Sequence, residues 1–270
     1  MRKEDDTTKV HLSEISSIVL QTNQVYISAY LLSELAKEKI SFVVADEKCS
    51  PIGHYLPLYG SHNTSKRIAE QLEWGEPIKK RVWQRVVRDK IAHQGMILNA
   101  RAREAEGEVL LGLVPEVRSG DTTNREASAA RIYFQALFGP GFSRDDDTPV
   151  NAALNYGYSI LLSAVSREIV SRGYLTQCGI CHRNEYNQFN LSCDLMEPFR
   201  PIVDRLVFDN IDDSFEKEDR YLLVDMLNQS VSYRGGMYRI GSVIGLYVQD
   251  CFSALNKKLS IDEIEPFDVL

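Results

Sequence analysis

The spacing of the hydrophobic residues changes near residue 60, and this change limits the kinds of fold the chain can adopt. Before it, apolar residues occur in short strand-like runs, and one helix-like stretch at 29–40 separates the last two. The strand-like runs are residues 10–20, 24–28 and 40–46. After Ser65, apolar residues recur at helical intervals. We therefore expect an α+β protein with a small β-rich N-terminal domain and a larger all-α catalytic domain.

The segment 50–63 (SPIGHYLPLYGSHN) separates the two patterns. It contains two prolines and two glycines, which are typical of turns and loops. A chain of 270 residues is also close to the length at which one hydrophobic core divides into two. We predict domains at residues 1–64 and 65–270.

No stretch of the sequence approaches the roughly 18 consecutive apolar residues of a membrane span, and the first nine residues contain no apolar core of a signal peptide. The five cysteines are too few and too unevenly spread for a disulfide framework. We expect a cytoplasmic protein that does not associate with membranes.

The charge distribution is uneven. The net charge of −7 argues against nucleic-acid binding, yet residues 66–103 contain ten basic and four acidic residues. Residues 204–225 contain three basic and eight acidic residues. This asymmetry permits a basic DNA-facing surface, although ordinary solvated helix faces would give the same counts. The basic side chains that we predict to contact phosphates are Arg81, Arg85, Arg88 and Lys90.

Acidic residues and one histidine form a candidate metal site. Glu126 lies on the packing face of a predicted helix at 124–139, where it could instead be exposed or paired with arginine. Asp194 and Glu197 are three residues apart and would share a helix face, but Pro198 places Glu197 either at a kink or near a helix N-terminus. With His182, these carboxylates form an oxygen-rich set that suits Mg²⁺ or Mn²⁺ better than structural zinc.

The segment Cys178-Gly-Ile-Cys181-His182 allows other interpretations. It matches the attachment pattern of c-type haem, which requires an exported protein, and it also resembles a redox dithiol. A redox dithiol should follow a strand, whereas this segment follows a long helical stretch. A zinc site that includes Cys193 is a further alternative.

Several motifs together resemble the CRISPR-associated integrase and endonuclease of spacer acquisition, especially its type II branch. They occur in the family's order along nearly the whole chain. The motifs are HLSEISSIVLQ (11–21), DEKCSPIGHYLPLYGSHN (46–63), WQRVVRDKIAHQ (83–94), NREASAARIYF (124–134), DDDTPVNAALNYGYSILLSAVSREIVSRGY (145–174) and CGICHRNEYNQFNLSCDLMEPFRPIVDRLV (178–207).

The resemblance implies catalytic metal ligands at Glu126, His182 and Glu197, with Asp194 as a neighbouring residue that orients a ligand or replaces one. It implies a Mg²⁺- or Mn²⁺-dependent enzyme that joins the 3′-hydroxyl of a captured double-stranded DNA fragment to the backbone of a repeat. It also implies a homodimer that works with a small ferredoxin-like subunit. In the family, further strands precede the segment that HLSEI matches, so we expect this chain to lack them. The alternatives are a non-catalytic DNA-binding relative and a zinc or thiol module.

Overall fold

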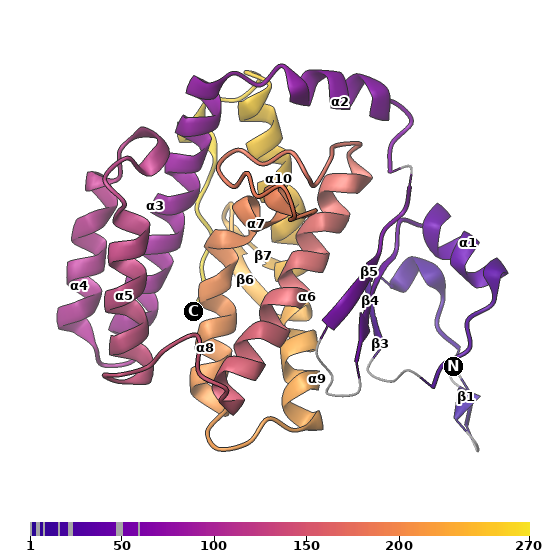
Figure 1. Cartoon of the computed structure of the whole chain (residues 1–270), viewed down its shortest axis with the longest axis horizontal. Helices are drawn as coiled ribbons and strands as arrows, with labels where there is room; N and C mark the ends of the chain where they lie inside the picture. Colours follow the sequence, from indigo (N-terminus) through magenta and orange to yellow (C-terminus); the bar gives the residue numbers. More distant parts are fainter. Residues whose placement is uncertain are drawn as a thin grey trace.

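The computed structural model shows a small sheet packed against a larger group of helices (Figure 1). The described residues are 2–3, 6–7, 9–15, 17–20, 24–46, 51–58 and 60–270. Cys49, one of the five cysteines considered above, lies outside them. A small N-terminal strand region followed by a mostly helical remainder confirms the expected α+β class.

The N-terminal sheet has the strand order β3-β4-β5. Strand β3 (Ser17–Leu20) pairs in parallel with β4 (Ser41–Ala45), and β4 pairs antiparallel with β5 (Pro51–Tyr55). Helix α1 (Ala29–Lys37) connects the two parallel strands, as such a crossover requires. A separate short pair, β1 (Arg2–Lys3) and β2 (Asp6–Thr7), precedes the sheet.

Two of the strand predictions need correction. Residues 24–28 are not in a strand, because Ser28 instead caps α1 by accepting a hydrogen bond from the backbone N–H of Leu31. The side chain of Tyr26 in this segment is fully exposed and has no sheet face to pack on. Among the described residues of the run at 10–20, only Ser17–Leu20 form a strand, since Leu12–Glu14 form a 3₁₀ turn.

The helical part begins with α2 at Thr64, nine residues after β5 ends at Tyr55. The proposed domain division at residue 64 stays a prediction. The helices of this part are α2 (Thr64–Leu72), α3 (Glu76–Ala100), α4 (Glu104–Leu113), α5 (Arg125–Phe138), α6 (Pro149–Ser171), α7 (Asn190–Met196), α8 (Arg200–Asn210), α9 (Lys217–Asp225) and α10 (Ile240–Leu255).

The main hydrophobic core lies among α3, α6, α8 and α10. Helices α4 and α5 cover α3 on one side, and the sheet with α1 lies beside α6 on the other (Figure 1). Close packing of α6 on α8 depends on Gly157, because a Cβ there would lie 2.4 Å from a methyl group of Val203. No helix in the described ranges is long and apolar enough to cross a membrane.

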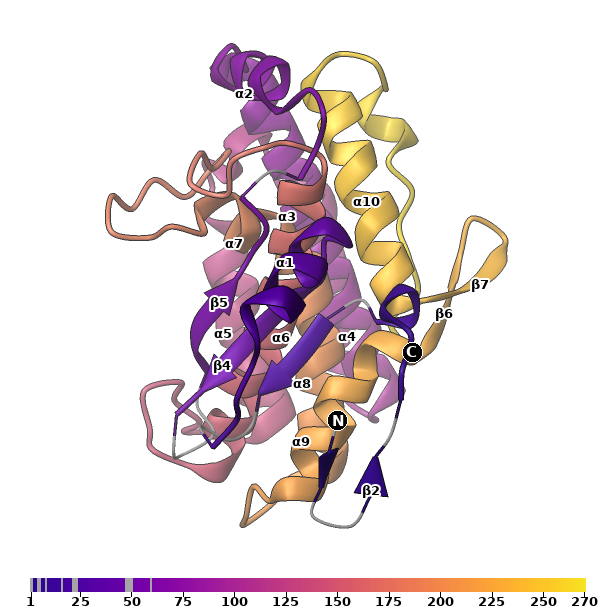
Figure 2. The same cartoon turned by 90° about the vertical axis from the view of Figure 1, so that its right-hand side faces the viewer.

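The helical part also contains a hairpin that the sequence analysis did not predict. Strands β6 (Ser230–Tyr233) and β7 (Gly236–Arg239) pair antiparallel and project beyond α10 (Figure 2). Arg234 and Gly235 both have positive φ, at 50° and 72°, as a tight two-residue hairpin turn requires.

The sheet is held to the helical part through α6. The backbone carbonyl of Lys39 accepts a hydrogen bond of 2.9 Å from the guanidinium of Arg167. Near the connection to α2, a Cβ on Gly60 would lie 1.7 Å from the carbonyl oxygen of Val170, so only glycine permits this approach.

Candidate active site

Glu126 lies in the first turn of α5, close to its N-terminus. The carboxylate of Asp121 accepts hydrogen bonds from the backbone N–H groups of Arg125 and Glu126, at 2.9 and 3.0 Å, and so satisfies two donors that the helix leaves unpaired. The Glu126 side chain is one-quarter exposed. This arrangement fixes the start of α5 and with it the direction of the Glu126 carboxylate.

Glu197 lies at a break between two helices. Helix α7 ends at Met196, residues Glu197–Phe199 form a 3₁₀ turn, and α8 begins at Arg200. Pro198 and Pro201 occupy first-turn positions after the break, where proline costs no backbone hydrogen bond. The two possibilities left open by the sequence therefore both hold, since Glu197 is at a kink and also next to a helix N-terminus.

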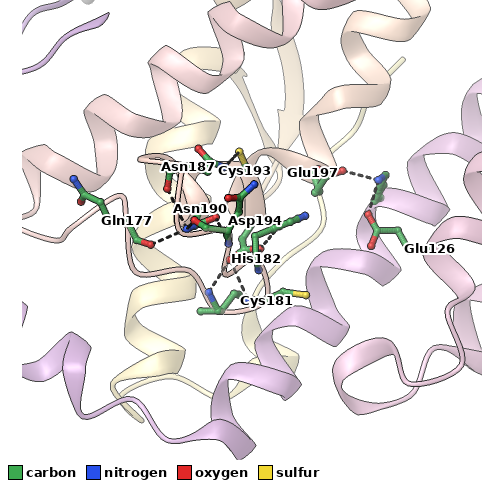
Figure 3. Close-up of polar contacts among 12 residues, drawn as sticks. Glu126, Gln177, Cys181, His182, Asn187, Asn190, Cys193, Asp194 and Glu197 are labelled. Carbon is green, nitrogen blue, oxygen red and sulfur yellow. Dashed lines mark hydrogen bonds and ion pairs between the residues drawn. The ribbon is translucent and has the colours of Figure 1, made fainter. Parts of the chain in front are cut away.

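The carboxylates of Glu126 and Glu197 share one ammonium group, that of Lys90 on α3. The Nζ atom lies 2.7 Å from Oε1 of Glu126 and 2.5 Å from Oε2 of Glu197. Figure 3 shows the two carboxylates approaching from separate segments, α5 and the turn between α7 and α8. The second contact is an ion pair without hydrogen-bond geometry, so Oε2 of Glu197 is buried with no hydrogen-bond partner. Oε1 of Glu197 lies 3.0 Å from Nε of Arg200.

These charges shift one another's pKa values. Burial alone would lower the pKa of Lys90, but the negative charges of Glu197 and Glu126 outweigh burial and raise it. Burial would likewise raise the pKa of Glu197, but Lys90 and Arg200 outweigh it and lower the value. Both members of the pair therefore stay ionised at neutral pH.

His182 is held by Asp194 of α7. The fully buried carboxylate of Asp194 lies 2.6 Å from the ring Nδ1 of His182 and accepts backbone N–H groups of Ile180, Cys181 and His182 at 2.6 to 3.1 Å. A Cβ on Gly179 would lie 2.8 Å from this carboxylate and 2.3 Å from the carbonyl oxygen of His182. The loop can therefore close around Asp194 only with glycine at that position.

The environment of His182 leaves its Nε2 atom as the nitrogen available to a ligand. The hydrogen bond to Asp194 is the main reason the pKa of His182 is raised; burial lowers it, and the charges of Asp194, Glu197 and Glu126 raise it further. Trp83 of α3 meets the imidazole edge-on at 5.8 Å between ring centroids. A carboxylate on Nδ1 with a free Nε2 is the arrangement that orients a metal-binding histidine.

Two carboxylates and one imidazole are donor types that suit a hard divalent cation. In the described part of the chain, however, no three His, Cys, Asp or Glu side chains are close enough together to hold a metal ion. The buried Oε2 of Glu197, which lacks a hydrogen-bond partner, is a suitable donor. The carboxylate of Glu126 and the imidazole of His182 would supply the others. The ammonium of Lys90 contacts both carboxylates that would bind the metal.

The four basic residues that we predicted to contact phosphates have different environments. Arg81 is exposed. Arg85 pairs through Nε with both oxygens of Asp89, at 2.8 and 2.9 Å, and Arg88 donates to the carbonyl of Val117. Lys90 is buried in the carboxylate pair. Phosphate contact stays a prediction for all four residues, and the charges of Arg85 and Lys90 are also paired within the protein.

Among the described cysteines, Cys178, Cys181, Cys193 and Cys251 are all free thiols. Cys193 Sγ accepts a weak hydrogen bond from Asn187 at 3.5 Å. Burial first, then the negative charges of Asp194 and Glu126, raise the pKa of Cys181 to about 11. These thiols form no metal-binding group with His182 in the described residues.

The sequence analysis missed three residues that shape this site: Asp121, Gly179 and Arg200. It considered Lys90 only as a phosphate contact, which stays a prediction, and did not predict its contacts to Glu126 and Glu197. One signal was available, because α3 carries Asp89, Lys90, His93 and Gln94 among otherwise apolar buried positions. Charged residues on a core-facing stripe require partners from other elements.

An open cavity of about 470 Å³ borders His182. Trp74, Glu76, Lys79 and Arg183 line it together with several amide side chains of the loop before α7. The exposed face of the imidazole therefore borders an open space with polar walls.

Comparison with known families is decisive. A family model described as CRISPR associated protein Cas1 matches residues 1–224. A CRISPR-associated endonuclease Cas1 of Neisseria meningitidis serogroup C is 42% identical over 207 residues, covering 77% of this chain and 68% of that protein. The chain belongs to the Cas1 family. The predicted resemblance is confirmed, and the Neisseria relative is consistent with the type II branch.

More distant relatives show the same fold. A casposase bound to its integration product has a TM-score of 0.77 at 20% identity, covering 94% of this Cas1 chain and 83% of the casposase. A chain of a Cas6-RT-Cas1–Cas2 complex has a TM-score of 0.73 at 20% identity, covering 98% of this chain and 34% of that one. At this identity the likeness concerns the fold.

Proposed function

We propose that this Cas1 protein is a metal-dependent DNA integrase with endonuclease activity. It inserts captured double-stranded fragments into a CRISPR repeat by attack of a 3′-hydroxyl on a phosphodiester. The named Cas1 endonuclease relative supports a role in nucleic-acid cleavage. The proposal rests mainly on one observation. The carboxylates of Glu126 and Glu197 meet at the ammonium group of Lys90, and Asp194 orients the imidazole of His182.

In this proposal Glu126, Glu197 and the Nε2 atom of His182 would hold Mg²⁺ or Mn²⁺. A bound ion would polarise the scissile phosphate and stabilise negative charge on the attacking and the leaving oxygen. Asp194 keeps the proton of His182 on Nδ1 and fixes the ring. Glu197 stays ionised because Lys90 and Arg200 offset its burial.

The proposed partners are double-stranded DNA, a second copy of this chain and a small ferredoxin-like subunit. Support for the small subunit comes from solved assemblies in which a Cas1 fold occurs in a complex with Cas2. Arg81, exposed on α3, is the proposed contact to the DNA backbone.

Strand transfer tests the proposal. A labelled duplex with free 3′-hydroxyl ends is incubated with a supercoiled plasmid, with Mn²⁺ or with EDTA, and with or without the small subunit. We expect product only with metal, and we expect loss of product but retained DNA binding in Glu126→Ala, His182→Ala and Glu197→Ala.

Glu106→Ala, which alters an exposed residue of α4, is the matched control and should behave as wild type. Integration that persists in all three site variants would contradict the assignment. Folded wild-type protein that binds DNA but gives no product in any condition would favour the non-catalytic alternative. Tightly bound zinc that is lost in Cys178→Ser and Cys181→Ser would favour the thiol module.

A further inference from the structure

Lys90 occupies an unusual position for a lysine side chain. Only 11% of its surface is exposed, and its ammonium contacts two carboxylates from different elements, Glu126 of α5 and Glu197 of the 3₁₀ turn before α8. Burying an ammonium costs several kcal/mol unless it is well paired. The two carboxylates provide that pairing here, and Lys90 in turn keeps them from repelling each other.

The charges around the two carboxylates balance without any metal. Glu126 and Glu197 carry two negative charges, and Lys90 and Arg200 carry two positive charges next to them. Asp194 adds one further negative charge behind the imidazole of His182. A divalent cation bound between these side chains would leave a net charge of +1 in a poorly solvated region. Such an excess is unfavourable at short range, where charges interact by several kcal/mol. A bound phosphodiester would reduce it, because each phosphate of DNA carries one negative charge.

We propose that Lys90 makes metal binding at this site depend on DNA: its ammonium holds Glu126 and Glu197 together in the metal-free protein and opposes a divalent cation until a phosphodiester supplies the missing negative charge. The inference rests on the proposed function, in which these two carboxylates are metal ligands. It makes Lys90 a positioning residue that acts on the two carboxylates. The metal site would thus be fully formed only on DNA.

The test measures Mn²⁺ binding directly, from the electron paramagnetic resonance signal of free Mn²⁺. Wild type is compared with Lys90→Gln, with and without a duplex whose 3′ ends lack the hydroxyl, and binding by the duplex alone is subtracted. Lys80→Gln is the matched control, since it removes the same charge from an exposed position on the same helix.

We expect DNA to tighten Mn²⁺ binding to wild type by about tenfold or more. Without DNA, Lys90→Gln should bind Mn²⁺ at least about tenfold more tightly than wild type, and DNA should add little. Lys80→Gln should match wild type in both conditions. Equal affinity of wild type and Lys90→Gln without DNA would overturn the inference while leaving the metal site in place.

Two other outcomes are also decisive. If Lys90→Gln is unfolded without metal, because its two carboxylates repel each other, Mn²⁺ should restore the wild-type circular dichroism spectrum, and failure to restore it would overturn the inference. If wild type binds no Mn²⁺ even on DNA, the proposed function and the inference both fall.

Discussion

The carboxylate of Asp194 and the imidazole of His182 are joined by a hydrogen bond of 2.6 Å, although the first is fully buried and nearly half of the second is exposed. Asp194 also accepts three backbone N–H groups from the loop that carries His182. One side chain therefore fixes both the path of the loop and the orientation of the ring.

Replacing Asp194 by Asn should reduce strand transfer about 10- to 100-fold, the usual effect of losing the partner that orients a metal-binding histidine. Asparagine keeps the size of the side chain, but its NH₂ group cannot accept the loop N–H groups. The assay is strand transfer with Mn²⁺. Asp145→Asn, in an exposed loop, is the control and should leave the rate unchanged. Wild-type activity in Asp194→Asn would show that the ring needs no carboxylate.

Gly179→Ala should unfold the loop around Asp194 and lower the free energy of unfolding by about 2 kcal/mol or more, since the new methyl group would overlap the carbonyl of His182. Chemical denaturation measures the change. Gly112→Ala is the matched control, because a Cβ there meets no atom within 4 Å and alanine favours the helix by up to about 1 kcal/mol. Equal stability of the two variants would contradict the packing argument.

Arg81→Gln and Arg85→Gln should have different effects although they remove the same charge from the same helix. The first should weaken DNA binding and reduce the slope of log affinity against log salt by about 1, as expected for one lost phosphate contact. The second should cost about 3 kcal/mol of stability, because it leaves the buried carboxylate of Asp89 without its cation. Binding titrations at several salt concentrations and urea denaturation separate the two. A stability loss in Arg81→Gln would contradict its exposed position.

Asp204 should make stability depend on pH. This carboxyl is buried on α8 and accepts a hydrogen bond from Tyr158. Burial raises its pKa to about 7, although Tyr158 and Arg200 act in the opposite direction. The folded protein holds this proton more tightly than the unfolded chain does. The stabilisation of the folded protein by Asp204 is therefore complete below about pH 4 and is lost as the pH rises through 7.

The free energy of unfolding should fall by on the order of 4 kcal/mol, because folding raises the pKa of Asp204 from 3.8 to about 7. Asp204→Asn removes the titrating group and should remove this part of the fall in stability between pH 4 and pH 7. Urea denaturation of both proteins across this range provides the test. Parallel pH profiles for wild type and variant would show that Asp204 titrates normally in the folded protein.

The long helices could be predicted from the sequence because their periodicity is strong and their ends carry ordinary signals. Helix α3 has proline in its first turn, and α5 ends before Gly139. The hairpin β6–β7 was missed, although Arg234 and Gly235 lie between short alternating runs that a search for tight turns would have flagged. Residues 24–28 were misassigned because β-branched and aromatic residues favour strands even where no neighbouring strand is available.

The candidate site could be predicted only as a set of residue types. Glu126, His182 and Glu197 came from a resemblance between motifs, and a single sequence gives no distance between them. The role of Lys90 depends on α3, α5 and the turn before α8 meeting at one point. No local pattern encodes such a meeting, so the sequence analysis considered Lys90 only as a phosphate contact.

The short helix α7 connects the two halves of the site. Asp194, which holds His182, and Glu197, which follows the last residue of α7, are three residues apart, and the backbone stays helical as far as Glu197. We therefore expect a change in the length of the loop between His182 and Asp194 to leave both candidate ligands in place, provided that Gly179 and the contacts to Asp194 are kept. One residue inserted between 194 and 197 would instead rotate the carboxylate by about 100° relative to the imidazole. The spacing of these two candidate site residues is therefore set by their positions in the sequence, within less than one turn of helix.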